Sequence, residues 1–183
     1  MNRAIHISLV AALSFSAQLA HAASFQLTSK SVKPGATLSA EHYWNSFGCT
    51  GKNVMPDLVW HGAPAGTKSF AVTFYDKDAP TGSGFWHWVA YDISADTTML
   101  PGGVDGGTLP AGAVEGNTDL SKPGFFGPCP PVGRQHRYVY TVHALKVDKL
   151  PVEKGASPAL IGFFIWQNAI AKATFEVKAG PRK

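Results

Sequence analysis

The 183-residue sequence has little charge, because Asp, Glu, Lys and Arg together make up only 15% of it. The formal net charge is +4, and the basic residues gather only in Arg134-Gln135-His136-Arg137. A protein that binds nucleic acid through its phosphates needs a denser stripe of lysine and arginine. Nucleic acid is therefore not an expected partner.

Long hydrophobic runs and cysteines are also scarce. No run reaches the ~20 apolar residues of a membrane-spanning helix, so we do not expect the chain to span a membrane. The two cysteines, Cys49 and Cys129, form no C-x-x-C pair, which argues against a redox dithiol and a zinc ribbon. Hydrophobic residues still make up 45% of the chain, enough for the core of one domain.

The N-terminal segment has the pattern of a secretion signal. Met1-Asn2-Arg3 gives a positive start, a charge-free stretch follows, and Ala20-His21-Ala22 fits the small-x-small cleavage rule. We predict a signal peptide over 1–22 that is removed, a single domain over 23–183, and a periplasmic location. In an oxidising compartment two cysteines favour one disulfide, with two separate buried thiols as the alternative.

Alternating apolar and polar residues predict strands over 25–28, 69–75, 87–93 and 138–146, with Pro- and Gly-rich connections between them. A single β-rich domain follows from this pattern. Two sets of residues are each expected to share one face of a strand: His87, Val89, Tyr91 and Ile93, and His136, Tyr138, Tyr140 and Val142.

One late helix is well marked. Ser157 suits the N-cap, Pro158 suits the first helical position, and the pattern predicts a helix over 159–172. A last strand is expected over 174–178. The residues expected on the buried side of the helix are Leu160, Phe163, Phe164 and Ile170.

Candidate site residues lie where loops meet predicted strands. The segments are Asp76–Pro80, Phe85–Trp88 and 127–138, the last containing Gly-Pro-Cys-Pro-Pro-Val-Gly and His136. A sheet fixes a side chain at such a junction while the loop leaves it accessible. Two histidines and two aspartates among aromatic residues would give a small pocket with few polar groups.

Structural roles remain open for these residues. A strand histidine is more often structural than ligand-binding, and Asp76 and Asp78 beside Pro80 are typical turn caps. The same four acid and imidazole groups would also suit a metal, but none has helical ligand spacing, so no metal or other cofactor is expected. Ser83 lacks the G-x-S-x-G context of a hydrolase nucleophile, and no phosphate-binding loop is present.

At these segments the chain resembles a known family. The run 73–80, then His87-Trp88, then 127–133 with 136–139, resembles the two signature regions of the phosphatidylethanolamine-binding protein family. Residues 24–177 are similar to its bacterial YbhB/YbcL-like, or Raf kinase inhibitor-like, branch. The resemblance implies a mainly β (α+β) fold of two antiparallel sheets, with a few short helices and one C-terminal helix.

The resemblance also implies a small anion pocket for phosphate-type or phospholipid head groups. By motif position, Asp78 would organise the pocket, Pro80 would follow a cis bond, and Trp86 would form a wall. Lys77 replaces the usual proline, and its charge would either attract an anion or point away. The residues that would line the pocket are Asp76, His87, Pro130, Pro131, His136 and Tyr138.

These residues suggest a binding mechanism. We expect His87 and His136 to donate ring N–H groups to an oxyanion, with the Tyr138 hydroxyl as a third donor. Asp76 would orient a histidine or accept from an ammonium or hydroxyl of the ligand. A Cys49–Cys129 bridge would stiffen the pocket rim.

Three functions follow, in order of support. The first is a non-enzymatic periplasmic protein that binds a phosphate-bearing anion. The second is a protein-interaction module that inhibits a protease or other enzyme, with 102–116 as an adaptable contact surface. The third is a hydrolase with His87 and His136 as acid and base or with a metal, which lacks an activated nucleophile. A homodimer is compatible with each.

Overall fold

Short and long antiparallel strands make up most of the structure. The strands are β1 (Gln26–Thr28), β2 (Val54–Met55), β3 (Leu58–His61), β4 (Ser69–Asp76), β5 (Phe85–Ser94), β6 (Met99–Leu100), β7 (Gly103–Val104), β8 (Val114–Glu115), β9 (His136–Leu145) and β10 (Ala169–Ala179). A 3₁₀ turn, η1 (Ala40–His42), and one α-helix, α1 (Pro158–Asn168), complete the elements. The computed structural model describes residues 24–183, so the predicted signal peptide lies outside the described residues.

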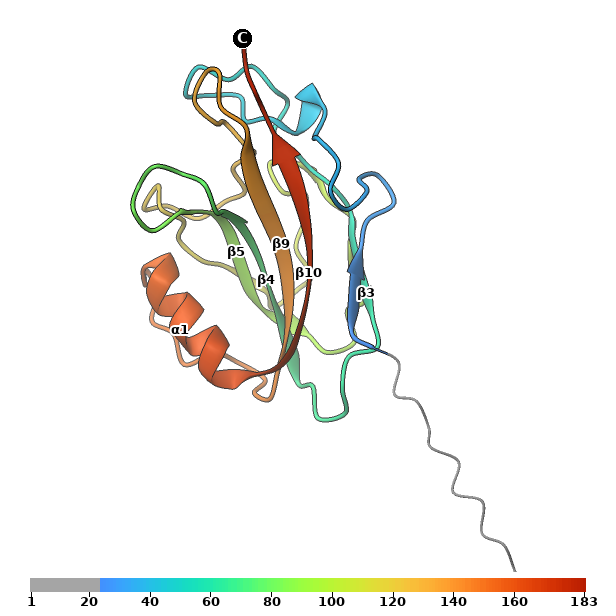
Figure 1. Ribbon diagram of the computed structural model, residues 1–183. Helices are drawn as coiled ribbons and strands as arrows, with labels where there is room; N and C mark the ends of the chain where they lie inside the picture. The colour runs from blue at the N-terminus through green and yellow to red at the C-terminus, as the bar shows by residue number, and fades with distance from the viewer. Residues whose placement is uncertain (1–23) are drawn as a thin grey trace, which may run out of the picture.

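A central sheet carries the other layers (Figure 1). Its five strands run in the order β10-β9-β4-β5-β8, and every neighbouring pair is antiparallel. Helix α1 covers one face of it, and the smaller sheet β1-β3-β6 covers the other (Figure 1). The prediction of a mainly β fold with antiparallel sheets and one late helix is confirmed. The short ribbon β2-β7 is an addition that the sequence did not predict.

The main core lies between the two sheets. Its aromatic centre is the stack of Phe74 on Tyr140, with ring centroids 4.1 Å apart. Because each aromatic ring buries a large apolar area, burying these rings contributes strongly to the stability of the core. The large residues buried there include Leu58, Trp60, Phe70, Trp88, Leu100, Phe125 and Tyr138. A second cluster, with Val89, Tyr91, Ile161 and Ile165, fills the space under α1.

A β-bulge in β5 changes which side chains face the main core. Phe74 pairs with Trp88, and the next residue, Tyr75, pairs with Trp86, so His87 has no partner on β4. The extra residue turns the His87 ring toward Phe74, at 5.5 Å between centroids. Bulges re-aim side chains in this way.

The predicted common face on β5 is therefore wrong. Val89 and Tyr91 pack under α1, whereas Ile93 lies in the main core. A second register shift accompanies Asp92, whose φ is 56°. The predicted face on β9 is confirmed, because Tyr138, Tyr140 and Val142 all lie in the main core; β9 has no bulge opposite β4.

Helix α1 begins as predicted and ends earlier. The Ser157 hydroxyl accepts a hydrogen bond from the Leu160 amide, as an N-cap does. The helix stops at Asn168, and the chain enters β10 at once, because pairing with β9 outweighs the helix propensity of 169–172. The predicted buried side is right only for Phe164, which packs on the cluster under α1. Leu160, Phe163 and Ile170 are exposed, and the buried residues of the helix are Ile161 and Ile165.

The glycine-rich segment 102–116 is held by several contacts. β7 pairs with β2, β8 pairs with β5, and the Asn53 amide donates to Asp105 at 2.7 Å. The glycines permit close approach, because a Cβ on Gly107 would lie 2.1 Å from the Gly102 carbonyl oxygen. These contacts do not test the predicted role of the segment as an adaptable contact surface, which stays a prediction. Within residues 24–183, no helix is long and apolar enough to cross a membrane.

Candidate functional site

Three polar residues of the two motifs meet at one end of the central sheet. Asp76 ends β4, while His136 begins β9 and His87 lies near the start of β5. Because β4 pairs antiparallel with both neighbours, the end of β4 lies beside the beginnings of the other two. The His136 Nδ1–H group donates to Asp76 Oδ2 at 2.8 Å. Topology therefore brings the predicted acid and imidazole groups together.

A cavity of about 230 Å³ opens at this end of the sheet, and we call it the imidazole pocket. Asp76, His87 and His136 are its main polar groups, all less than 8% exposed. The rim is aromatic, with Trp44 stacked on Phe47 at 5.3 Å. The lining residues are Trp44, Phe47, Asp76, Ala79, Pro80, Thr81, Phe85, His87, Leu120, Cys129, Pro131 and His136. Concave, mostly apolar sites with few polar groups are typical of ligand binding.

A buried asparagine fixes the loop behind His87. The His87 Nδ1–H group donates to the Phe126 carbonyl oxygen at 2.8 Å. The next amide, of Gly127, donates to Asn53 Oδ1 at 2.6 Å, and the Asn53 amide donates to the Phe125 carbonyl. A Cβ on Gly127 would lie 2.2 Å from the His42 carbonyl oxygen, so only glycine fits.

Sequence reasoning missed Asn53 and the aromatic rim. Asn53 lies outside both motifs, and its left-handed backbone, with φ of 54°, could not be predicted from the sequence. Trp44 and Phe47 come just before Cys49, so a disulfide to the second motif was the one available signal that they would approach the pocket.

The protonation state of His87 follows from its burial. Burial lowers the pKa of His87 to about 4, with a smaller opposing effect of the Asp76 charge, so the ring is neutral near pH 7. Its one N–H group is at Nδ1, already bonded to Phe126, which leaves a lone pair at Nε2.

The His136 ring likewise uses its Nδ1–H group within the protein, on Asp76. Among the described residues, neither Nε2 has a protein hydrogen-bond partner. For the neutral His87 ring, donation from Nε2 to an oxyanion would require an added proton. The hypothesis that both rings donate to an oxyanion stays a prediction.

Asp78 lies behind the pocket and supports Asp76. The Asp78 amide donates to Asp76 Oδ1 at 2.9 Å. The Asp78 carboxylate accepts from the Arg137 guanidinium at 2.6 and 2.9 Å and from the Arg137 amide at 2.8 Å. These hydrogen bonds from Arg137 lower the pKa of Asp78 to about 2. The arrangement ties the end of β4 to the start of β9.

Two predicted lining residues lie beneath the pocket. Tyr138 is fully buried, and burial beside Asp76 raises the pKa of its phenol. Its hydroxyl has no hydrogen-bond partner among residues 24–183. Pro130 is buried too, and its carbonyl accepts from Arg182 at 2.6 Å. Neither residue lines the cavity, whereas Pro131 does.

Three details of the first motif differ from expectation or resolve an open alternative. Trp86 is not a wall of the imidazole pocket, because it packs on Tyr75 at 4.8 Å and faces α1. Pro80 lines the pocket, but the cis bond in the described chain precedes Pro181. The Lys77 ammonium points away from the pocket to Glu176, at 2.9 Å.

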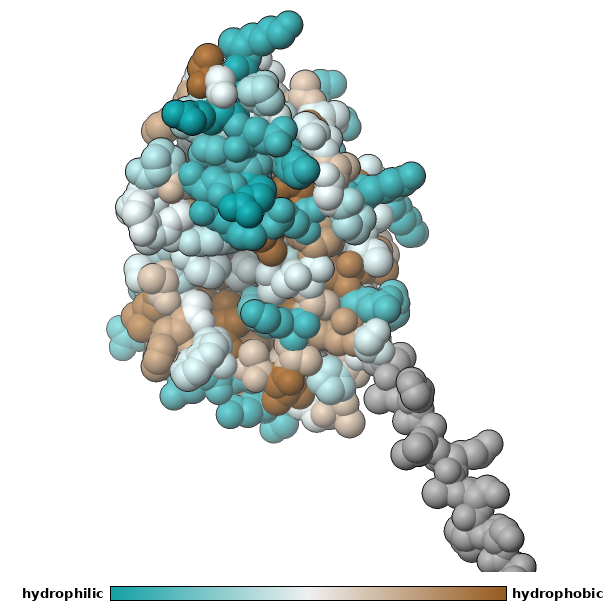
Figure 2. Space-filling view, in the orientation of Figure 1, coloured by the Kyte–Doolittle hydropathy of each residue, from teal (hydrophilic) through white to brown (hydrophobic). Residues whose placement is uncertain are grey.

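A cationic hollow adjoins the pocket. It measures about 750 Å³ and shares Pro80, Pro131 and His136 with the imidazole pocket. Arg134, Arg137 and Lys178 also line it, as do Asp78 and Gln135. Figure 2 shows hydrophilic surface at the end of the molecule where β9 begins and β10 ends. The positive groups would favour an anion at this end.

The disulfide joins Cys49 to Cys129, with the Cα atoms 5.9 Å apart. The predicted pairing is therefore present. Cys129 lines the imidazole pocket, so the bridge holds the segment with Trp44 and Phe47 against the second motif. Among residues 24–183, no three His, Cys, Asp or Glu side chains are grouped as metal ligands would be.

An antiparallel β domain with one small polar-floored cavity at a sheet end has the form of a ligand-binding protein. Residues 28–179 match the phosphatidylethanolamine-binding protein family, and the chain belongs to that family.

Its relatives include two Escherichia coli K12 proteins. It is 47% identical to UPF0098 protein YbcL over 186 residues, covering 97% of this chain and all of YbcL. It is 45% identical to UPF0098 protein YbhB over 151 residues, covering 81% of this chain and 96% of YbhB. The crystal structure of E. coli YbcL superimposes with a TM-score of 0.81 at 48% identity, covering 86% of this chain and 98% of that one. The bacterial branch implied by the motifs is thus confirmed.

Proposed function

We propose that this protein is a non-enzymatic, periplasmic binding protein whose imidazole pocket takes a phosphate-type head group. The observation that carries the proposal is the convergence of His87 and His136 with their Nε2 atoms free of protein partners, beside the buried Asp76 carboxylate. A ligand oxygen at the pocket floor would meet both rings.

Binding of an anion there is coupled to a proton. The neutral His87 ring offers a lone pair at Nε2, and the Asp76 carboxylate lies beside His136, so this floor disfavours a fully ionised phosphate. A phosphate monoanion brings a P–OH group that donates to one Nε2. Alternatively, His136 takes a proton that Asp76 stabilises, and its Nε2–H group then donates. In either route the bound complex holds one proton more than the protein and the fully ionised phosphate hold when separate. Affinity for the phosphate therefore falls as pH rises.

The surroundings of the floor suit an esterified phosphate. The aromatic rim of Trp44, Phe47 and Phe85 would contact the organic group next to the phosphate. Arg134 and Lys178 in the adjoining cationic hollow would attract the charged end from solution. A phospholipid head group and a small phosphomonoester share this chemistry.

Binding is favoured over catalysis because the lining offers no free hydroxyl or thiol to act as an activated nucleophile. The Thr81 hydroxyl donates to the Gly84 carbonyl, and Cys129 is held in the disulfide. The predicted signal sequence and the disulfide together support export to the periplasm. Sequencing the N-terminus of protein recovered from a periplasmic extract tests this, with Ala23 as the expected first residue.

Calorimetric titration with phosphoethanolamine and with glycerol 3-phosphate, at about pH 6 and about pH 8, tests the pocket. We expect weak binding, micromolar to millimolar, that is tighter at the lower pH. His136→Gln should abolish it, while His61→Gln, which changes an exposed histidine on β3, should not. Equal affinity at both pH values would overturn the proton coupling. Unchanged affinity in His136→Gln would overturn the site.

A further inference from the structure

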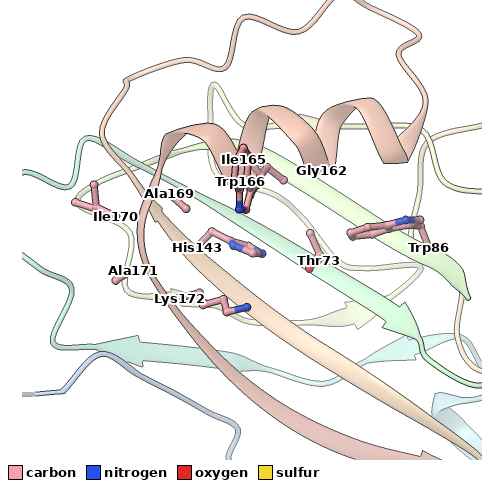
Figure 3. Close-up of a pocket in the computed structure, with 10 residues that line it drawn as sticks. All are labelled: Thr73, Trp86, His143, Gly162, Ile165, Trp166, Ala169, Ile170, Ala171 and Lys172. Carbon is pink, nitrogen blue, oxygen red and sulfur yellow. The ribbon is translucent and has the colours of Figure 1, made fainter. Parts of the chain in front are cut away.

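A second cavity lies between α1 and the face of the central sheet opposite the imidazole pocket (Figure 3). It measures about 360 Å³, and we call it the helix cavity. Its lining residues are Thr73, Trp86, His143, Gly162, Ile165, Trp166, Ala169, Ile170, Ala171 and Lys172. None of the roles proposed above uses it.

Three neighbouring strands supply a polar floor to this cavity. Lys172 on β10 lies directly opposite His143 on β9. Thr73 on β4 pairs with Thr141, two residues from His143 and on the same face of β9. Figure 3 shows Thr73, His143 and Lys172 side by side beneath the helix. The floor therefore combines a hydroxyl, an imidazole and an ammonium group.

The floor groups are free to bind a ligand. Thr73 is only 3% exposed, and both Thr73 and His143 line the cavity. Among residues 24–183, neither the Thr73 hydroxyl nor the His143 ring forms a hydrogen bond with another protein group, so both are available to a ligand in the cavity. Burial, and then the Lys172 charge, lower the pKa of His143 to about 4, so the ring stays neutral and offers an N–H group. The lining carries one positive charge and no carboxylate.

Apolar side chains form the walls and the mouth. Trp86 closes one side, Ile165 lies above the floor, and Trp166 is 75% exposed (Figure 3). Helix α1 is apolar on its outer side as well, with Phe163 half exposed. An apolar helix in water is unusual unless something covers part of it.

We propose that the helix cavity binds a small carboxylate that carries a short aliphatic or aromatic group. The carboxylate lies against Lys172, His143 and Thr73, which together provide a charge and neutral donors. The apolar group contacts Trp86 and Trp166. The volume is at the lower end of the range for small-ligand sites, which limits the guest to a compact molecule. This site is independent of the imidazole pocket and of its proposed ligand.

NMR titration of the ¹⁵N-labelled protein tests the proposal. The probes are hexanoate and benzoate, each compared with its neutral amide, hexanamide and benzamide. We expect the acids to shift the Trp86, Trp166 and His143 signals at millimolar concentration and to bind about fivefold more tightly than the amides. Comparing the affinities of hexanoate and benzoate shows whether the cavity prefers an aliphatic or an aromatic apolar group.

Matched variants separate charge recognition from apolar contact. Lys172→Gln, at an exposed position, should weaken acid binding about fivefold and leave amide binding unchanged. Thr73→Val should weaken acid binding as well. Lys33→Gln, which changes an exposed lysine that lines neither the helix cavity nor the cationic hollow, should not. Absence of shifts at these residues, or equal binding of acids and amides, would overturn the proposal.

Discussion

The His136 ring donates from Nδ1 to Asp76 Oδ2 at 2.8 Å, although 60 residues separate the two in the chain. Both side chains are buried, at 6% and 3% exposure. This bond uses the Nδ1–H group of the ring and places the Asp76 carboxylate beside it. Protonation of the ring would turn its free Nε2 from an acceptor into a donor, and Asp76 would stabilise the charge that results.

Asp76→Asn should therefore weaken anion binding. The amide oxygen still accepts from His136, but the charge that stabilises a protonated ring is lost. Loss of a charge-assisted hydrogen bond costs about 1.5 kcal/mol or more, so we expect affinity for phosphoethanolamine near pH 6 to fall about tenfold or more. Calorimetry measures this, with Asp148→Asn, an exposed position, as the control. An Asp76→Asn protein that is folded by circular dichroism and binds normally would contradict the mechanism.

His87 should make the protein sensitive to acid. Burial holds its pKa at about 4 in the folded state, below about 6.5 in the unfolded chain. The unfolded state thus binds a proton first, and stability is lost as pH falls from about 6.5 to 4, by about 3 kcal/mol. Urea unfolding of His87→Gln across this range should show a flatter pH profile. The exposed-residue variant His61→Gln should keep the native slope, and the same slope in both variants would refute the assignment.

Removing the disulfide should lower stability and loosen the pocket. The bridge closes a loop across 80 residues of sequence, so the double variant Cys49→Ser/Cys129→Ser should lose about 2–4 kcal/mol of unfolding free energy. Affinity for phosphoethanolamine should fall too, because Trp44 and Phe47 lose their covalent tie to the second motif. Reduction of the native protein should reproduce both losses. A double variant as stable as the native protein would argue against a structural role for the bridge.

Lys77 should affect the backbone and not the ligand. Its ammonium pairs with Glu176, so Lys77→Gln should change phosphoethanolamine affinity by less than about twofold. Its amide donates to the Arg137 carbonyl at 3.0 Å, which a proline would remove. Lys77→Pro should therefore cost about 1 kcal/mol in urea unfolding. A large loss of affinity in Lys77→Gln would show that the ammonium reaches the ligand after all.

Several features were predictable because they depend on neighbours in the chain. The alternation of β9, the N-cap at Ser157 and the order of the two motifs are local patterns, and each is present in the structure. The motifs also gave the histidines and Asp76. Their convergence required knowing that β4 lies between β5 and β9.

Local patterns could not predict effects that arise between strands. The bulge at His87 comes from the register of β5 on β4, and α1 ends at Asn168 because 169–172 pair with β9. Both outcomes minimise free energy over contacts distant in sequence, which outweigh the local preferences of a few residues.

The sequence by itself determined the family and the mainly β fold, and it favoured the disulfide that the structure contains. It also identified Asp76, His87 and His136 as candidate site residues. The tertiary structure alone decided which imidazole nitrogen is free, that Tyr138 lies beneath the pocket, and that Trp86 faces a different cavity. Residue identity sets what a side chain can donate or accept. The hydrogen-bond partners that packing supplies set what remains available to a ligand.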